Sequence, residues 1–308
     1  MSNIVILIEE MDLIIVALGV VPKYLDDCIK QITFTQKNYT IHLIKSSSSD
    51  YTNHNCLITD VENIPMSKNH SHFIKNSKLI KKKFRNFFWR FSTERLYVID
   101  DYLQMQDLKD IIHIETDVLL YQDLENVIPV LQSYDFACVR DSDIRVIGSI
   151  IYIKNKEISK KISSIASEYI NENDMVILHY IEKKINNSLC LPIGDNDNYR
   201  NGLKYIFDAA SIGQFLDGID PRNKARTIMS FVKGLKKLFK KKIEINFINK
   251  DSNLNISEWE IKWINNKPYK KTNNCLIPIV NLHIHSKNLK KFIYSNRITD
   301  HLNYYSEQ

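Results

Sequence analysis

Short apolar runs alternate with amphipathic segments from the start of the chain. Residues 13–18 are continuously apolar and end at Gly19, a pattern typical of a strand buried on both faces of a sheet. Residues 24–32 carry apolar side chains at helical spacing, and residues 40–45 and 56–59 predict a second and a third strand. A strand, a helix and a strand in this order open an α/β fold, so we expect a mostly parallel central sheet flanked by helices.

The rest of the chain continues the alternation of strands and helices. Residues 60–83 are polar and basic and are expected to form a mobile loop in which His70 and His72 are only solvated. Beyond it the pattern predicts helices at 84–103, 158–170 and 174–185, and strands at 110–114, 134–139, 145–153 and 277–284. No internal repeat and no linker divides the chain, so we expect one domain over residues 1–308 that ends in a polar tail.

Composition narrows the class of protein. Hydrophobic residues make up 44% of the chain and charged residues 25%, which are values of ordinary globular proteins and exclude disordered, collagen-like and coiled-coil classes. The net charge of +6 is too small for a protein that binds nucleic acid over its whole surface, and we expect no nucleic-acid partner. The five cysteines contain no Cys-x-x-Cys pair and are expected to be buried thiols of a reducing compartment.

Two features concern membranes. The apolar runs at 4–8 and 13–21 are interrupted by acidic residues, fall short of the roughly 20 residues of a membrane span and follow no basic segment. Residues 223–242 alternate apolar residues with lysines and arginines, which predicts a basic amphipathic helix. Its charged face either is solvated or rests on anionic lipid or a negatively charged acceptor. We therefore expect a cytoplasmic protein, with peripheral membrane contact through this helix as an open alternative.

The sharpest chemical feature is a pair of carboxylates at the end of a predicted strand. Glu115 and Asp117 follow the apolar residues 111–114 and precede the apolar residues 118–120. Two residues apart, they point to one face if the strand continues, and they lie where α/β sheets bind ligands. Two charges in an apolar run are costly unless a cation neutralises them, and Mg²⁺ or Mn²⁺ meets that need. The alternative is a solvated strand end with two unrelated acids.

A second feature is an alternating run near the end of the chain. His283 and His285 would share one face of the strand predicted at 277–284, and Lys287 would continue that face. One imidazole could complete a metal site with the two carboxylates, and the lysine could neutralise phosphate oxygens. Histidines that alternate on an edge strand also occur for purely structural reasons.

The third feature is a segment rich in glycine. Four of the seven glycines fall between residues 194 and 218, which indicates irregular backbone or close backbone approach. Residues 205–223 embed Asp208, Asp220 and other polar groups among apolar ones, so several must be hydrogen-bonded or line a site. The run from Asp220 to Asn223 is also typical of an ordinary turn.

Together these motifs resemble the metal-dependent nucleotide-sugar glycosyltransferases of the GT-A fold. Residues 115–117 look like a variant of the acidic Asp-x-Asp motif of that family, with Glu in the first position. The patterns His-x-Glu-x-Asp, Phe-Asp-x-Ala-x-x-Gly-Gln and Leu-His-x-His-Ser-Lys, at 113–117, 207–214 and 282–287, recur in this order in one bacterial and viral group of that family. Residues 90–95 and 173–175 also look like that group, and the resemblance runs from about residue 12 to 292.

The resemblance implies a GT-A, Rossmann-like fold with a nucleotide-binding part at about 12–120 and an acceptor-binding part at about 121–292. It implies that Asp117 and Glu115 hold Mn²⁺ or Mg²⁺ and that His285 or His283 supplies a further ligand. The residues implied to contact the donor, a UDP- or GDP-sugar, are Ala17, Leu18 and Gly19 near the base and ribose, Thr116 within the acidic motif, and Arg95 and Lys287 near the phosphates or sugar. The implied acceptor is a glycan or glycoconjugate.

An inverting enzyme of this kind needs a carboxylate base for the acceptor hydroxyl, whereas a retaining one does not. Asp208 is the first candidate for that base, followed by Asp174 and Asp220. Two alternatives stay open: Asp208 could cap the helix that follows it, and Arg95 could pair with an acid of its own helix, at 100 or 101.

Two other classes of function remain open. A metal-dependent nucleotidyltransferase would also grip phosphates through paired acids, but it would be expected to carry a glycine-rich or basic loop after the first strand, which residues 19–22 do not supply. A non-catalytic binding protein on the same fold is the third reading. The abundance of Asn, Lys and Ile indicates an AT-rich genome, so we expect the cytoplasm of a bacterial cell or of a virus-infected host.

Overall fold

The structure is a computed structural model that describes residues 11–194, 203–220, 249–273 and 275–293. The helix predicted at 223–242 and most of the polar tail lie outside these ranges. Among the helices that are described, none combines the length and the apolarity that a membrane crossing requires.

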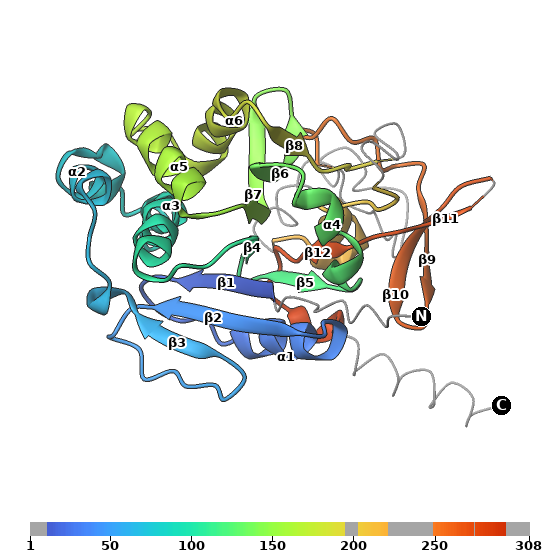
Figure 1. Ribbon diagram of the computed structural model, residues 1–308. Helices are drawn as coiled ribbons and strands as arrows, with labels where there is room; N and C mark the ends of the chain where they lie inside the picture. The colour runs from blue at the N-terminus through green and yellow to red at the C-terminus, as the bar shows by residue number, and fades with distance from the viewer. Residues whose placement is uncertain (1–10, 195–202, 221–248, 274, 294–308) are drawn as a thin grey trace, which may run out of the picture.

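The first part of the chain forms the parallel half of a central sheet (Figure 1). Strand β1 (Met11–Ala17) pairs in parallel with β2 (Tyr39–Lys45), and β2 pairs in parallel with β3 (Leu57–Asp60). Helix α1 (Leu25–Thr35) connects β1 to β2 and buries its apolar stripe, including Leu25. This is the strand, helix and strand order predicted from the apolar pattern.

Four more strands complete a seven-stranded sheet with the order β3-β2-β1-β4-β7-β6-β8. They are β4 (Ile111–Ile114), β6 (Phe136–Ser142), β7 (Arg145–Ile153) and β8 (Ser188–Cys190). Strand β7 runs antiparallel to both neighbours, and the other neighbouring pairs are parallel. The expected α/β fold with a mostly parallel central sheet is confirmed.

The two faces of the sheet are buried by different elements (Figure 1). One face packs on three helices: α3 (Phe88–Met105), α5 (Lys156–Glu168) and α6 (Asp174–Lys184). Ile14 of β1 and Ile44 of β2 point to this face, whereas Leu13 and Ile15 point to the other face, which packs on α1 and on strand β5. Successive side chains of a strand alternate between faces, so an apolar run without polar interruptions is what a sheet covered on both sides requires.

Smaller elements extend the second layer. They are the short helix α4 (Ile128–Leu131), the pair β5 (Val118–Leu120) and β12 (Asn281–His283), and the antiparallel strands β9 (Glu260–Ile264), β10 (Lys267–Lys271) and β11 (Leu276–Pro278). Asn265 and Asn266 have φ of 48° and 59°, the left-handed conformation that a tight turn between β9 and β10 needs.

The expectation of a mobile loop over residues 60–83 is wrong. The segment contains helix α2 (Lys68–Asn76), which begins at a Ser67 cap and buries Phe73 completely. His70 is also buried: its Nδ1 lies 2.7 Å from Asp101 of α3, and its Nε2 lies 3.5 Å from Glu94. Few apolar residues of this segment pack on the core, and it is fixed partly by the ion pairs of His70. Ion pairs between distant residues produce no hydrophobic periodicity, so the sequence pattern did not predict the helix. His72 is exposed, as predicted.

The strand predicted at 277–284 is not continuous. Its first residues form β11 and its last ones form β12, and the two strands belong to different sheets. Between them Ile279 forms a parallel bridge with Ile206, and Val280 donates to the Ile206 carbonyl. The strands pair with different partners, but residues of each pair are buried, so the sequence stays mostly apolar from 277 to 284. The apolar pattern therefore does not reveal where the chain changes from one partner strand to the next.

We predict that His70 makes stability pH-dependent. Burial opposes protonation, but Asp101 and Glu94 more than offset it and raise the pKa of His70 to about 9. A raised histidine pKa stabilises the fold below the unfolded pKa near 6.5, and this contribution is lost as the pH rises through 9. The contribution of His70 to the free energy of unfolding in urea should therefore fall by roughly 3 kcal/mol between these pH values. The overall fall should be smaller by this amount in His70→Gln, and it should be unchanged in the exposed neighbour variant His72→Gln.

Candidate active site

The acidic residues predicted to bind metal lie where β4 leaves the central sheet. All four residues of β4 are buried, and the chain then turns through Glu115 and Thr116 to Asp117 before it enters β5. Strand β5 pairs antiparallel with β12, and this register sets Val118 opposite His283. The Ile284 N–H donates to the Asp117 carbonyl at 2.9 Å. The ladder between β5 and β12 is therefore what brings a histidine far along the chain to the acidic pair.

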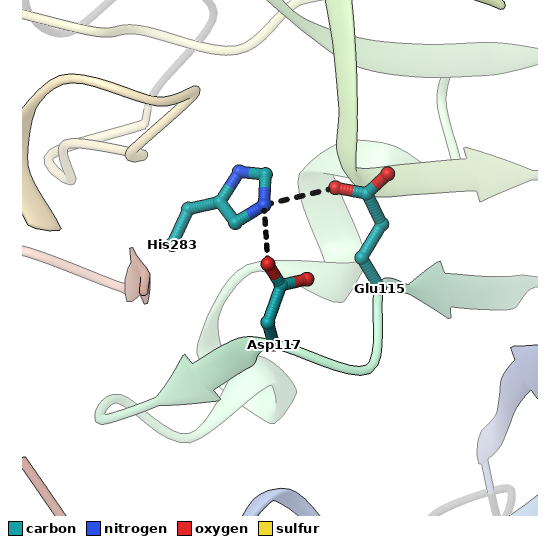
Figure 2. A group of neighbouring side chains, drawn as sticks. All are labelled: Glu115, Asp117 and His283. Atoms are coloured by element: carbon teal, nitrogen blue, oxygen red, sulfur yellow. Dashed lines mark ion pairs between the residues drawn. The ribbon is translucent and has the colours of Figure 1, made fainter. Parts of the chain in front are cut away.

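Glu115, Asp117 and His283 form a compact group of possible metal ligands (Figure 2). His283 Nε2 lies 3.1 Å from Glu115 Oε2 and 3.2 Å from Asp117 Oδ2. The three ligand atoms all lie within 4.8 Å of one another, and the group is the only one of its kind among the described residues. Two carboxylates and one imidazole are a donor set that suits a divalent cation, and the carboxylates favour Mn²⁺ or Mg²⁺.

The hydrogen bond on the far side of the His283 ring favours metal binding. Nδ1 lies 2.6 Å from the Ala209 carbonyl, which can only accept, so Nδ1 carries a proton. In the neutral ring this leaves the Nε2 lone pair directed at the two carboxylates, the arrangement usual for metal-bound histidine. Burial opposes protonation of Nε2, but with no cation present Asp117 and Glu115 raise the pKa of His283 to about 9.

Of the two histidines predicted for this role, only His283 belongs to the ligand group. The His285 ring lies edge-on to it, with the centroids 4.3 Å apart. Burial, followed by the charge of His283, lowers the pKa of His285 to about 3. His285 is therefore a neutral neighbour of the group.

Arg95 pairs with the site and not with its own helix. Its guanidinium, in the middle of α3, forms an ion pair with Glu115 and another, at 2.7 Å, with Asp174 at the start of α6. Burial alone would raise the pKa of Glu115, but Arg95 and His283 lower it below its usual value. Gly148 on β7 leaves room for this guanidinium, because a Cβ there would collide with it. The alternative pairing of Arg95 with acids at 100 and 101 is wrong.

Lys287 is the second counter-charge. It forms an ion pair with Asp117, and its backbone has φ of 61° in the turn that follows β12. Burial alone would raise the pKa of Asp117. The charges of Lys287 and His283 outweigh this effect and hold the pKa of the carboxyl well below its usual range. Lys287 was predicted to contact phosphate, and in the structure its ammonium contacts Asp117. The chain reaches it through a turn, however, and not along one strand face.

Tyr24 is a residue of this site that sequence reasoning missed. It lies at the start of α1, and the Lys287 ammonium is 5.7 Å from its ring centroid. Burial, with the nearby Asp117 carboxylate, raises the pKa of Tyr24, and its hydroxyl interacts with Thr116. Its place in the connection after the first strand was the available signal, because such connections face the ligand crevice of an α/β sheet.

Asp208 organises the backbone around His283. Its Oδ1 accepts from the N–H groups of Ser211 and Ile212, and its Oδ2 accepts from those of Gly213 and His283. The Asn281 side chain, in turn, pairs with both backbone polar groups of Asp208. Backbone N–H groups thus occupy both carboxylate oxygens, and this geometry supports the capping alternative over a general base at this position.

The other two carboxylates proposed as bases differ from Asp208. Asp174 contacts Arg95 through Oδ2, while its buried Oδ1 has no hydrogen-bond partner within the described residues. Burial outweighs the effect of Arg95 and raises the pKa of Asp174. Asp220 is buried at the end of the glycine-rich segment and lies 3.6 Å from Arg85. Asp174 thus lies one ion pair away from Glu115, whereas the ion pair of Asp220 is with Arg85.

The residues predicted to contact the nucleotide lie at the carboxyl end of β1. Ala17 ends the strand and Leu18 follows it, while Gly19 has φ of 74° and donates its N–H to the Ser46 hydroxyl at 2.9 Å. A Cβ at Gly19 would also press on the Phe91 ring. Next to this end, a cavity of about 570 Å³ opens at the ends of β2 and β3, and its walls include Lys45. Parallel strands place these ends at the same edge as Glu115 and Asp117.

Comparison with known proteins gives likenesses of fold only. No protein-family profile matches the chain, and no curated protein does. Among solved structures, the glycosyltransferase GlyE of Streptococcus pneumoniae TIGR4 is 14% identical, with a TM-score of 0.38 over 72% of this chain and 50% of that one. The galactosyltransferase LgtC is 13% identical, with a TM-score of 0.39 over 70% and 78% of the two chains. Mouse xyloside xylosyltransferase 1 is 8% identical, with a TM-score of 0.39 over 59% and 86%.

This chain spans about half the length of the GlyE chain. At these identities and TM-scores the likenesses do not carry a functional argument, which rests instead on the residues of the site.

We predict that Gly213→Ala destabilises the site. A Cβ at Gly213 would overlap the backbone carbonyl of His283, which cannot swing away as a side chain could. The free energy of unfolding in urea should fall by roughly 1–3 kcal/mol. In the control Gly194→Ala the added Cβ would meet Leu254 Cδ1 at 3.2 Å, the end of a flexible side chain, so the change should be smaller. Equal losses for both variants would contradict the close approach at Gly213.

Proposed function

We propose that this protein is a metal-dependent glycosyltransferase that moves a sugar from a nucleoside diphosphate sugar to a hydroxyl of a glycan or glycoconjugate. The observation that supports it is the ligand group of Glu115, Asp117 and His283 with Lys287 beside it, at the sheet edge where α/β folds bind ligands. A divalent cation in this group supplies Lewis-acid stabilisation of the charge that develops on a departing diphosphate.

Different residues of the chain would bind the cation, keep its ligands ionised and contact the diphosphate. Glu115 and Asp117 are kept ionised by Arg95 and Lys287, so both offer charged oxygen ligands. His283 offers Nε2 because the Ala209 carbonyl holds the proton on Nδ1. Lys287, which pairs with Asp117, would offer its ammonium to a diphosphate oxygen.

For the nucleoside of the donor we propose the surface that runs from Gly19 and Tyr24 to the cavity at the ends of β2 and β3. Gly19, just after β1, has no side chain, so the backbone is accessible there. Tyr24 offers an aromatic ring beside Lys287. The cavity at the ends of β2 and β3 is lined mainly by polar groups, which include the Lys45 ammonium and the Asp60 carboxylate. Such a site suits the hydrogen-bonding groups of a base and a ribose, and UDP and GDP are the donor nucleotides we propose.

Asp174 is the carboxylate we propose as the base for an inverting reaction. It keeps one oxygen without a partner within the described residues, and burial raises its pKa toward the range in which a carboxylate accepts a proton. Its ion pair with Arg95 ties it to Glu115 and therefore to the ligand group.

We predict that one nucleoside diphosphate stabilises the protein only when Mn²⁺ is present. A ligand that binds the folded state raises the melting temperature by mass action. A thermal-shift panel of UDP, GDP, ADP and their sugars, each with and without Mn²⁺, identifies the nucleotide. Asp117→Asn should abolish the metal-dependent part of the shift because it removes a charged ligand. The exposed control Asp107→Asn should retain the whole shift, since Asp107 forms its salt bridge with surface Lys156.

A second readout separates binding from catalysis. The donor identified by the panel should release nucleoside diphosphate in the presence of Mn²⁺ and a glycan acceptor, and Asp117→Asn should slow this at least 100-fold, as expected when a metal ligand is lost. Stabilisation without turnover would favour a non-catalytic binding protein. Turnover of a nucleoside triphosphate with release of pyrophosphate would favour a nucleotidyltransferase. No shift with any nucleotide would refute the proposal.

We predict that Lys287→Met weakens binding of the diphosphate and not of the nucleoside. If the ammonium contacts phosphate oxygens, the dissociation constant of the nucleoside diphosphate with Mn²⁺ should rise roughly tenfold, the size of one charged hydrogen bond. Isothermal titration with the diphosphate and with the matching nucleoside measures the difference. An equal change for both ligands, or an equal change in the exposed control Lys30→Met, would place Lys287 away from the phosphates.

A further inference from the structure

One of the two strongly basic segments of the chain lies directly before and within the start of α3. Residues 63–93 contain no Asp or Glu, and six Lys and Arg residues lie between 78 and 90. The remaining 36 Lys and Arg residues balance the 36 Asp and Glu residues of the chain. Residues 78–90, which we call the basic–aromatic loop, therefore carry six positive charges and no negative one.

The lysines of the basic–aromatic loop are free to meet a partner. Lys78, Lys81, Lys82 and Lys83 are exposed, and none forms an ion pair within the part of the chain that the structure describes. Arg85 is the exception, since it lies 3.6 Å from Asp220. Four neighbouring ammonium groups repel one another, so their proximity is unfavourable until an anionic surface offsets it.

Large apolar side chains are exposed among these charges. Phe84 is 49% exposed and Phe88 is 43% exposed, and both rings pack on Trp89, stacked and edge-on respectively. Met66, 53% exposed, lines the same small cavity as Arg90 and so adds to this apolar surface. A soluble surface rarely groups exposed aromatic residues beside lysines unless something covers them.

The loop is held in a defined position. Leu79 is buried, and the Ser77 hydroxyl caps the turn at Lys78–Lys81 while it donates to the Ile170 carbonyl. Arg85, Asn86 and Phe87 all have positive φ, with values of 47°, 55° and 65°. Three consecutive non-glycine residues in the left-handed region are costly, so the surrounding contacts must impose this shape.

We propose that the basic–aromatic loop is a docking surface for an anionic lipid bilayer. Clustered lysines are attracted to acidic headgroups, and Phe and Trp side chains enter the boundary between headgroups and acyl chains. Nucleic acid is the less suitable partner, because the aromatic rings stack on one another and do not present free faces to bases. The surface differs from the basic segment 223–242, and the inference does not depend on the proposed transferase activity.

The position of the loop links lipid binding to the site. Arg85 contacts Asp220 at the end of the glycine-rich segment, and Phe91, one turn into α3, packs against Gly19 at the end of β1. A bilayer at the basic–aromatic loop would therefore lie near the carboxyl edge of the sheet.

Co-flotation of the full chain with vesicles tests the inference. Vesicles of phosphatidylcholine are compared with vesicles that also contain phosphatidylserine, at low and at high NaCl. The charge variant Lys81→Glu/Lys82→Glu/Lys83→Glu should bind the phosphatidylserine vesicles about 100-fold more weakly, since each lysine near the surface contributes on the order of a fivefold gain in partition. The aromatic variant Phe84→Ser/Phe88→Ser should bind more weakly and lose the part of the binding that resists salt.

The matched control Lys30→Glu/Lys37→Glu/Lys109→Glu changes the net charge by the same amount at exposed lysines elsewhere. It should bind like the wild type, and all variants should show the wild-type melting temperature, because the substituted residues are exposed. Binding that the charge variant retains would place the membrane contact elsewhere, for example at 223–242, and overturn the inference. Equal losses in the control, no binding at low salt, or tighter binding to single-stranded DNA than to vesicles would also overturn it.

Discussion

The burial of two carboxylates at the end of β4 constrains the structure around them. An unpaired buried charge costs several kcal/mol, so Glu115 and Asp117 are tolerated only with compensating cations. Arg95 from α3, Lys287 from the last turn and the His283 imidazole from β12 supply that compensation, and each comes from a different part of the chain. Helix α3, strand β5 and strand β12 must all dock correctly before the acids are neutralised. Under the proposed function, a divalent cation would replace the proton of His283 and free Lys287 from Asp117.

The imidazole is held by a scaffold that itself contributes no ligand. Asp208 fixes the His283 backbone by accepting its N–H, and Ala209 next to it fixes the ring by accepting from Nδ1. Asn281 closes the arrangement by pairing with the Asp208 backbone. Gly213 permits it, because the turn that Asp208 caps runs directly against the His283 carbonyl. Rigid second-layer contacts of this kind keep a ligand in place before a cation arrives.

Helix α3 connects the site with the basic–aromatic loop. Its first turn continues from the exposed aromatic residues of that loop, and its middle carries Arg95 to Glu115. On the same helix, Glu94 and Asp101 form ion pairs with His70. These pairs attach α2, which precedes the basic–aromatic loop, to α3. The acidic residues of α3 thus face inward while the lysines before it face outward. Charge is separated between a buried acidic site and an exposed basic surface without a large net charge on the protein.

The sequence predicted the order of strands and helices, because continuous apolar runs reveal strands that are covered on both faces. It also singled out residues 115–117, 283 and 287, because polar and charged residues stand out within or beside such apolar runs. The choice of His283 over His285 and the pairing of Arg95 with Glu115 were not predictable, and the capping by Asp208 was one of two alternatives that the sequence left open. Arg95 reaches Glu115 from a different element, and His283 reaches the acidic pair only through the ladder of β5 and β12, which has no period of its own in the sequence. The placement of His70 was missed for the same reason. Local hydrophobic periodicity determines which segments form strands and helices. Which cationic side chain neutralises each buried carboxylate is determined only by the tertiary structure, because the partners come from distant segments.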